Sequence, residues 1–130
     1  MKEPVWIEKE ALLLLHGASL ARFGGAEGIR DEGLLDSALA RPVNRFHYAR
    51  SDERPADLAD LAAAYAFGLV KNHAFVDGNK RAAFLACGVF SAINGKKLDA
   101  PAAEAFAAIM ALADSSVSEQ EFAMWIRRHW

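Results

Sequence analysis

Nine consecutive residues, 73–81, place several reactive side chains on one short segment, which reads His-Ala-Phe-Val-Asp-Gly-Asn-Lys-Arg. His73 carries an imidazole, a group that changes its protonation state near neutral pH and can take a proton from an attacking hydroxyl. Asp77 offers a hard carboxylate oxygen, which Mg²⁺ accepts as a ligand when nucleotide phosphates complete its shell. A base beside a candidate metal ligand is an arrangement that phosphoryl transfer requires.

The second half of the segment has residues that could hold phosphate. Gly78 and Asn79 fall where an apolar helix is predicted to begin, and the exposed N–H groups of a helix start bind anions. Lys80 and Arg81 add full positive charge, Lys as a compact cation and Arg as a planar fork that grips phosphate oxygens. Phe75 is expected to bury its ring and fix the loop on the core.

Ordinary structural explanations exist for each of these residues. A histidine that ends an apolar helix is usually structural, and Asp-Gly-Asn is a common turn in which Asn79 could cap the next helix. Lys80 and Arg81 alone would be solvated charges. His73 and Asp77 could instead ligate a transition metal, although two ligands without a third are a weak signal. The joint spacing is what favours phosphate chemistry.

Hydrophobic periodicity predicts the elements that must position this segment, and all of them are helices. Their expected ranges are 8–23, 31–40, 56–72, 79–93, 101–113 and 118–129. A short extended piece is expected at 5–7. Pro42 should end the second helix, because proline lacks the N–H that continues a helix. Residues 41–55 should then form an irregular flap or loop.

Local signals mark several helix ends and faces. Asp31 can cap the second helix, and Ser118 with Glu121 forms a capping box for the last one. Pro101 is expected in the first turn of its helix, where a missing N–H costs little. Leucines 12–15 are expected to face the core, together with Leu20, and the alanine-rich helix at 56–72 should pack closely against its neighbours.

The nine-residue segment resembles the motif of the Fic/Doc family, and within it that of the death-on-curing (Doc) toxins of bacterial toxin–antitoxin modules. The family pattern His-x-Phe-x-Asp/Glu-x-Asn-Gly/Lys-Arg is met at His73, Phe75, Asp77, Asn79, Lys80 and Arg81. The Gly-rich segment at 24–35 and Asn94-Gly95 are also similar to the Doc branch, so the resemblance spans roughly residues 5–127. It implies an all-α bundle of the Fic/Doc type, with a short flap before the central motif helix.

The resemblance also implies roles for the motif residues. His73 would be the general base and Asp77 the Mg²⁺ ligand. The phosphates would be contacted by Gly78, Asn79, Lys80 and Arg81. Adenylylating Fic enzymes usually carry Gly at the position of Lys80 and a second Arg at that of Phe84. A lysine in the anion site should reverse the orientation in which the nucleotide binds. ATP would then present its γ-phosphate to the target, and the enzyme would act as a protein kinase.

Partners follow from the same resemblance. The expected target is a threonine of elongation factor Tu, whose modification stops translation. Many Fic enzymes restrain themselves through a Ser/Thr-x-x-x-Glu-Gly/Asn helix, and here Ser115 and Glu119 are followed by Gln120, which is not a match. A Phd-like antitoxin with a disordered tail is therefore expected. The alternatives are an adenylyltransferase or other nucleotide-dependent transferase, and a non-catalytic binding module.

Composition is consistent with this interpretation. A chain of 130 residues predicts one domain, 1–130. Its 15 Lys and Arg against 17 Asp and Glu argue against a general nucleic-acid partner. The single Cys87, without a signal peptide or membrane-spanning run, predicts a cytoplasmic protein with no membrane partner. His16 and His129 are expected to pack or lie at the surface, and Arg30 with Asp31 to form an ion pair or helix cap.

Overall fold

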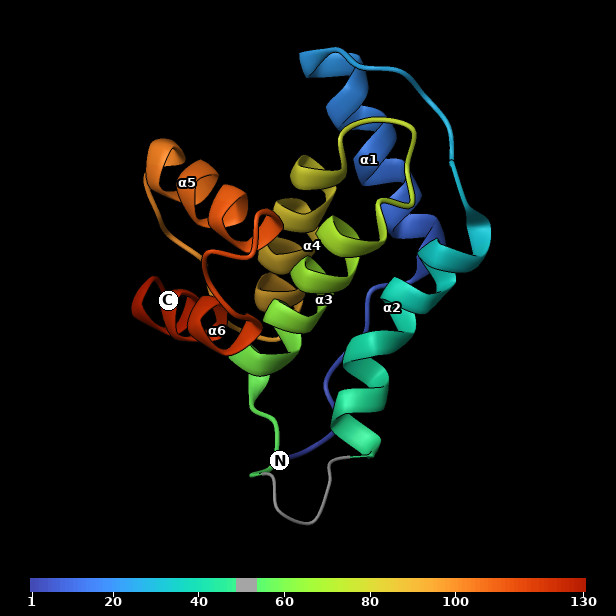
Figure 1. Cartoon of the computed structure of the whole chain (residues 1–130). Coiled ribbons are helices and arrows are strands. Elements are labelled where there is room, and N and C mark those ends of the chain that lie inside the picture. The colour runs from blue at the N-terminus through green and yellow to red at the C-terminus, as the bar shows by residue number, and fades with distance from the viewer. Residues whose placement is uncertain (49–53) are drawn as a thin grey trace.

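The computed structural model describes residues 1–48 and 54–130. Within them the regular structure consists of six helices and no strand, which confirms the expected all-α class (Figure 1). The helices are α1 (Lys9–Phe23), α2 (Glu32–His47), α3 (Leu58–Asn72), α4 (Asn79–Ile93), α5 (Ala102–Ala113) and α6 (Glu119–Arg128). None of the described helices combines the length and the hydrophobicity that crossing a bilayer demands.

Helix α3 is the central element, and Figure 1 shows it between α2, α4 and α6. Its alanines are almost completely shielded from solvent, and their small side chains let neighbouring helices come close. The closest approach is at Gly68, where a Cβ atom would lie 3.1 Å from the Cα of Ala38 in α2. The predicted close packing is confirmed, and it holds the C-terminal end of α3, where the motif begins, on a buried support.

The predicted end of the second helix at Pro42 is wrong, because α2 continues to His47. Proline removes the bond that Ala38 would otherwise accept within the helix. However, Leu35, Ala38 and Pro42 share one buried face of α2. The apolar area that this face buries against α3 outweighs one lost hydrogen bond, so tertiary packing overrides the local signal.

The predicted start of the flap at residue 41 is wrong for the same reason. Residues 41–47 belong to α2, and Tyr48 is its C-cap. Residues 49–53, the middle of the predicted flap, lie outside the described residues. Residues 54–57 then lead into α3 without helical structure.

Most local signals give the helix ends that they predict. Asp31 caps α2 by accepting a hydrogen bond from the backbone of Leu34 at 2.9 Å, and the Ser118–Glu121 capping box is present. Pro101 is the N-cap of α5 and so lies just before its first turn. Of the leucines expected in the core, Leu12 is fully buried whereas Leu14 is 76% exposed, because consecutive positions cannot share one helix face.

A network of charged side chains closes the end of α3 opposite the motif. Asp57 and Asp60 form a capping box there. Arg127 from α6 donates to both carboxylates at 2.9 Å, and Arg54 donates to Asp60 at 2.6 and 2.9 Å. Asp60 is buried, so these donors replace the water that it loses. The network therefore fixes α6 to the start of α3.

This network predicts a defined acid sensitivity. Burial opposes ionisation of Asp60, but hydrogen bonds from Arg54 and Asp57 outweigh it and lower its pKa from 3.8 to about 2. A lowered pKa stabilises the fold above the unfolded pKa, and that stability is lost as pH falls from about 4 through 2. Asp60→Asn should thus reduce the unfolding free energy by about 2 kcal/mol at pH 6, with a difference that shrinks below pH 3.

Urea unfolding at pH 6 and pH 2.5 measures this effect. The exposed Glu10→Gln is the matched control, since it also removes one carboxylate but touches no network. An equal acid dependence in wild type and Asp60→Asn would show that the network does not set the acid limit.

Candidate functional site

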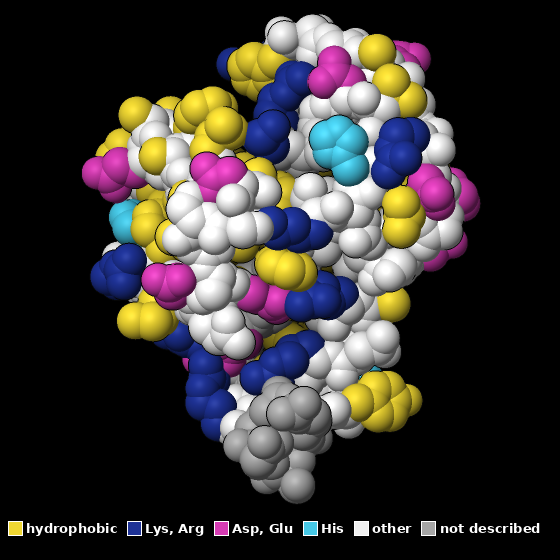
Figure 2. All heavy atoms as spheres, in the orientation of Figure 1, with side chains coloured by type: hydrophobic (Ala, Val, Ile, Leu, Met, Phe, Trp, Pro, Cys, Tyr) yellow, Lys and Arg dark blue, Asp and Glu magenta, His cyan; other side chains and the backbone are white. Residues whose placement is uncertain are grey.

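The motif forms the turn between α3 and α4. His73 is the C-cap of α3 and adopts the left-handed conformation, with φ 53° and ψ 49°. Its side chain is exposed. In the region where this turn lies, the surface carries an exposed histidine among Lys and Arg side chains (Figures 1 and 2). The imidazole is therefore accessible to a hydroxyl of another molecule.

Phe75 fixes the turn to the core, as predicted, and its ring is completely buried. The side-chain amide of Asn79 reaches back to the backbone of this residue, accepting from its N–H at 2.9 Å and donating to its C=O at 3.0 Å. Asn79 is only 5% exposed, and it does not cap α4, whose N-cap is Gly78. Its predicted contact with phosphate stays a prediction, and in this structure its side chain holds the turn.

Asp77 points its carboxylate to the surface between two backbone donors. One oxygen accepts from the N–H of Gly78 at 2.8 Å and the other from the N–H of Ala26 at 3.1 Å. These bonds, first that of Ala26 and then that of Gly78, lower the pKa of the carboxyl, and the charge of Arg81 adds to the effect. The group is therefore held in its ionised, ligating form at neutral pH.

A metal site built on the carboxylate of Asp77 suits Mg²⁺ better than a transition metal. Among the described residues no three His, Cys, Asp or Glu side chains gather into a metal site. Mg²⁺ needs no such cage, since it is commonly bound by one or two carboxylates together with water and substrate phosphates. Asp77 could supply that carboxylate, and the cation would then reduce the negative charge of the phosphates.

The start of α4 is open towards the same surface. Gly78 has φ 74°, and no side chain caps the helix there. Lys80 is exposed, whereas Arg81 is half-buried and donates to the carbonyls of Ser19 at 3.2 Å and Gly24 at 2.8 Å. The N–H groups of the first turn of α4, a lysine and an arginine thus lie within one helical turn, an arrangement that can hold phosphate oxygens.

Residues 24–31 support the turn, a role that sequence analysis missed. Ile29 forms an isolated antiparallel bridge with Phe75. The N–H of Val76 donates to Gly28 at 3.0 Å, and the N–H of Arg30 donates to Ala74 at 2.7 Å. The segment therefore runs antiparallel to the motif and is hydrogen-bonded to it, but too few residues are paired to form a sheet. Its similarity to the Doc branch was the only sign of this in the sequence.

The side chain of Arg30 binds backbone rather than a carboxylate, so of the two alternatives expected for Arg30 and Asp31 the helix cap, made by Asp31, is the one observed. Its Nε donates to the carbonyl of His73 at 2.7 Å and its Nη2 to that of Asn72 at 3.1 Å. The last carbonyls of a helix have no partner inside it, so these bonds satisfy them. Arg30 therefore holds the backbone of His73 without touching its imidazole.

Arg30→Leu should loosen the turn while the rest of the fold persists. Removing a charged donor from two carbonyls costs about 1.5 kcal/mol, which corresponds to roughly tenfold faster opening. Amide hydrogen exchange at Val76, whose N–H donates to Gly28, measures it when followed by NMR. Arg128→Leu, an equal change at an exposed position of α6, is the control. Unchanged exchange in Arg30→Leu would mean that the turn does not depend on this side chain.

Gly25 leaves little room for a side chain between the supporting segment and the motif. It has φ +128°, and a Cβ atom would lie 2.7 Å from Leu20 Cδ2 and 3.0 Å from Asp77 Oδ2. Gly25→Ala should therefore destabilise the fold by about 1–3 kcal/mol, through backbone strain at positive φ and because the tips of Leu20 and Asp77 would have to move. Gly24→Ala is the matched control, because Gly24 also has positive φ but no atom within 4 Å of its Cβ position. Equal melting temperatures for the two variants would contradict the close contact.

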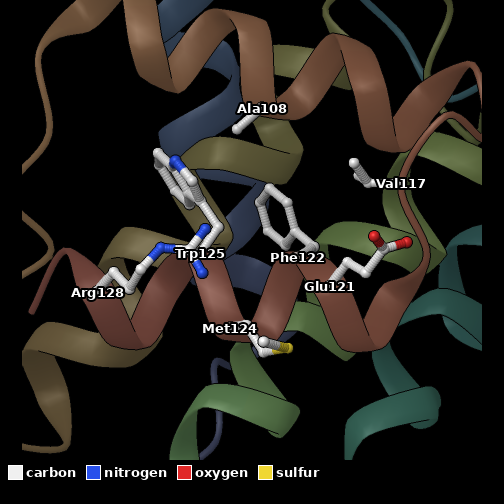
Figure 3. Close-up of a pocket in the computed structure, with 7 residues that line it drawn as sticks. All are labelled: Ala108, Val117, Glu121, Phe122, Met124, Trp125 and Arg128. Carbon is white, nitrogen blue, oxygen red and sulfur yellow. The ribbon is translucent and has the colours of Figure 1, made fainter.

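The described residues also line pockets beyond the turn, and two of these pockets contain aromatic side chains. A predominantly apolar groove of about 360 Å³ runs between α1, α4 and α5, next to Lys80 and Arg81. Phe23 and Phe106 line it and are 67% and 65% exposed. A smaller pocket of about 220 Å³ lies between α5 and α6, where Phe122 and Trp125 stand towards Ala108 while Met124 points away (Figure 3). No motif residue lines the smaller pocket.

Comparison with known proteins agrees with this geometry. Residues 6–91 match the model of the Fic/DOC family. The chain is 46% identical over 87 residues to Toxin Doc of Mycolicibacterium smegmatis. The matched residues are 67% of this chain and 64% of that protein, so the chain spans just under two thirds of the relative's length. It is 33% identical over 96 residues, 73% of each chain, to Protein kinase doc of Escherichia phage P1. The chain therefore belongs to the Fic/Doc family.

Proposed function

We propose that this protein is the toxin of a toxin–antitoxin module and acts as a Mg-ATP-dependent protein kinase. Its target would be a threonine hydroxyl of elongation factor Tu, and its effect the arrest of translation in the cytoplasm. The observation that carries the proposal is one turn that unites the exposed His73, the ionised Asp77 and the uncapped start of α4. A relative named as a protein kinase supports the reaction class.

In the proposed reaction His73 acts on the target hydroxyl. The imidazole takes the hydroxyl proton as the oxygen forms its bond to the γ-phosphorus. The bond between that phosphorus and the oxygen bridging to the β-phosphate breaks, and ADP leaves. Kinase catalysis consists mainly of positioning and charge stabilisation. The hydrogen bonds from Arg30 to the end of α3 would contribute by holding the backbone of His73 in place.

The remaining motif residues would hold the nucleotide. Asp77 would ligate Mg²⁺, which supplies positive charge against the phosphates. Gly78 would supply backbone at the anion site, although its own N–H donates to Asp77 in this structure. Asn79 would offer its backbone N–H, and Lys80 and Arg81 would be the full cations. Lys80 is exposed beside the helix start, and its side chain would compete for the volume that a nucleotide's α- and β-phosphates would otherwise take. This supports a nucleotide that presents its γ-phosphate instead.

We propose that residues 1–130 form one domain. Helices α5 and α6 lie beyond residues 6–91, which match the family model, yet they share one hydrophobic core with α3. A Phd-like antitoxin would restrain the toxin from outside. The apolar groove beside Lys80 and Arg81 supports such a partner, because a disordered tail that folds on binding needs apolar surface to bury.

Label transfer tests the proposal. Purified protein and Mg²⁺ are incubated with elongation factor Tu and ATP labelled at the γ- or the α-phosphate. The expected result is transfer of the γ label alone. Transfer of the α label would identify an adenylyltransferase. Transfer of neither, with no ATP binding by calorimetry, would identify a non-catalytic binding module.

The antitoxin needs a separate test. Co-expression with the neighbouring reading frame should restore growth to cells that express the protein. A protein that is active in vitro but tolerated alone would contradict the need for an external inhibitor.

A further inference from the structure

His16 lies in α1, far from the motif in sequence, but its ring is buried against it. The side chain is 5% exposed and stacks on the ring of Phe75, with centroids 3.8 Å apart and planes inclined by 15°. Its Nε2 lies 2.8 Å from the backbone carbonyl oxygen of Asp77. A carbonyl can only accept, so Nε2 carries the hydrogen and donates it.

This contact is more specific than packing requires. A leucine or phenylalanine could also fill an apolar space beside Phe75, and a buried imidazole costs free energy unless its polar atoms are bonded. The partner of His16 is the main chain of the residue that offers the carboxylate. The ring also lies close to the next residue, since a Cβ atom on Gly78 would be 3.4 Å from His16 Nε2.

Asp77 is thereby held from two sides. His16 holds its carbonyl, while the N–H of Ala26 holds its carboxylate at 3.1 Å. With the backbone and the carboxylate both bonded, the side chain has little freedom to turn. Outer contacts of this kind orient a ligating group, and their loss typically weakens metal binding by 10–100-fold.

We propose that His16 is a positioning residue, which sets the direction of the Asp77 carboxylate and the start of α4 for Mg²⁺ and nucleotide. This rests on the proposed function, in which Asp77 ligates Mg²⁺. His16 itself touches neither the target nor the nucleotide. Its contribution is to fix the main chain on which both depend.

Three variants of His16 separate its hydrogen bond from its volume. His16→Phe keeps a ring against Phe75 but cannot donate. In His16→Gln the amide nitrogen lies at nearly the same distance from the backbone as Nε2, so it can donate to the carbonyl of Asp77. The asparagine side chain of His16→Asn is one methylene shorter and cannot reach that carbonyl. We expect the Mg²⁺ concentration for half-maximal transfer to rise at least tenfold in His16→Phe and His16→Asn, and to stay within threefold of wild type in His16→Gln.

Tyr65→Phe is the matched control. It removes another buried bond between a side chain and the backbone, in which the N–H of Ile7 donates to the Tyr65 hydroxyl at 3.0 Å. Its melting temperature should fall without a change in Mg²⁺ dependence. KM for elongation factor Tu should be unchanged in every variant that folds, because His16 is buried beneath the turn.

Amide exchange at Val76 and Gly78 gives a readout without activity. It should be about tenfold faster in His16→Phe and unchanged in His16→Gln and Tyr65→Phe. If wild type transfers no phosphate, the proposed function fails, and exchange together with Mg²⁺ binding still tests His16. If His16→Phe does not fold, His16→Gln is compared with His16→Asn. Equal exchange and equal Mg²⁺ dependence in variants with and without a donor would overturn the proposal.

Discussion

His73→Asn should lower the rate of phosphoryl transfer by about 10²–10⁴-fold, the usual contribution of a positioned general base. Asparagine is the informative replacement because residue 73 has φ 53°. Among residues with a Cβ atom, asparagine adopts this left-handed conformation with the least strain. The backbone that Arg30 holds should therefore keep its shape, and the loss should come from the missing base. Single-turnover transfer to elongation factor Tu at saturating ATP measures the effect.

The control for His73→Asn is its melting temperature, which should stay close to that of wild type. His73→Ala should lose activity similarly but also some stability, since alanine is strained at positive φ. A His73→Asn protein that transfers phosphate at the wild-type rate would remove His73 as the base. Another group would then have to accept the proton.

Asp77→Asn should raise the Mg²⁺ concentration that the reaction needs and lower its rate by at least about 10²-fold. The asparagine oxygen can still accept one of the two backbone bonds that Asp77 makes, so the turn should persist. It lacks the negative charge that binds a hard divalent cation and would leave the phosphate charge less compensated. Transfer rates across a Mg²⁺ titration measure the change.

Asp31→Asn provides the matched control for Asp77→Asn. It makes the same substitution in the supporting segment, at an N-cap position where asparagine caps as well as aspartate. Its Mg²⁺ titration should coincide with that of wild type. An Asp77→Asn protein that retained the wild-type titration would show that Mg²⁺ is bound elsewhere.

The sequence predicted the helices well where local and tertiary preferences agree. Helix α4 has the predicted bounds because Gly78 before it and Asn94 after it both stop an apolar pattern. At Pro42 the two preferences conflict, and the local rule failed since it does not count the apolar face that α2 buries on α3. The hydrophobic periodicity of a sequence does not show how much apolar area a helix face will bury against its neighbour.

The motif could be read from one segment, but its supports could not. His73 and Asp77 were identified because their types and spacing suit phosphate chemistry. His16 and Arg30 contact the turn across 61 and 43 positions of sequence, and a hydrogen bond to backbone leaves no pattern in the residue types. Asn79 was expected to face phosphate, and only the structure reveals that its amide is bound to Phe75.

The way residues 24–31 lie along the turn has a genetic consequence. Selection for cells that survive expression of the protein should recover mutations in two separate stretches of the gene, one over the motif and one over α1 and residues 24–31. Substitutions in the second stretch would spare every group assigned to the reaction and still silence the protein, because a side chain at residue 25 would meet Asp77 and because Arg30 holds the backbone of His73. Survivors would thus map the mechanical support of the turn independently of its chemistry.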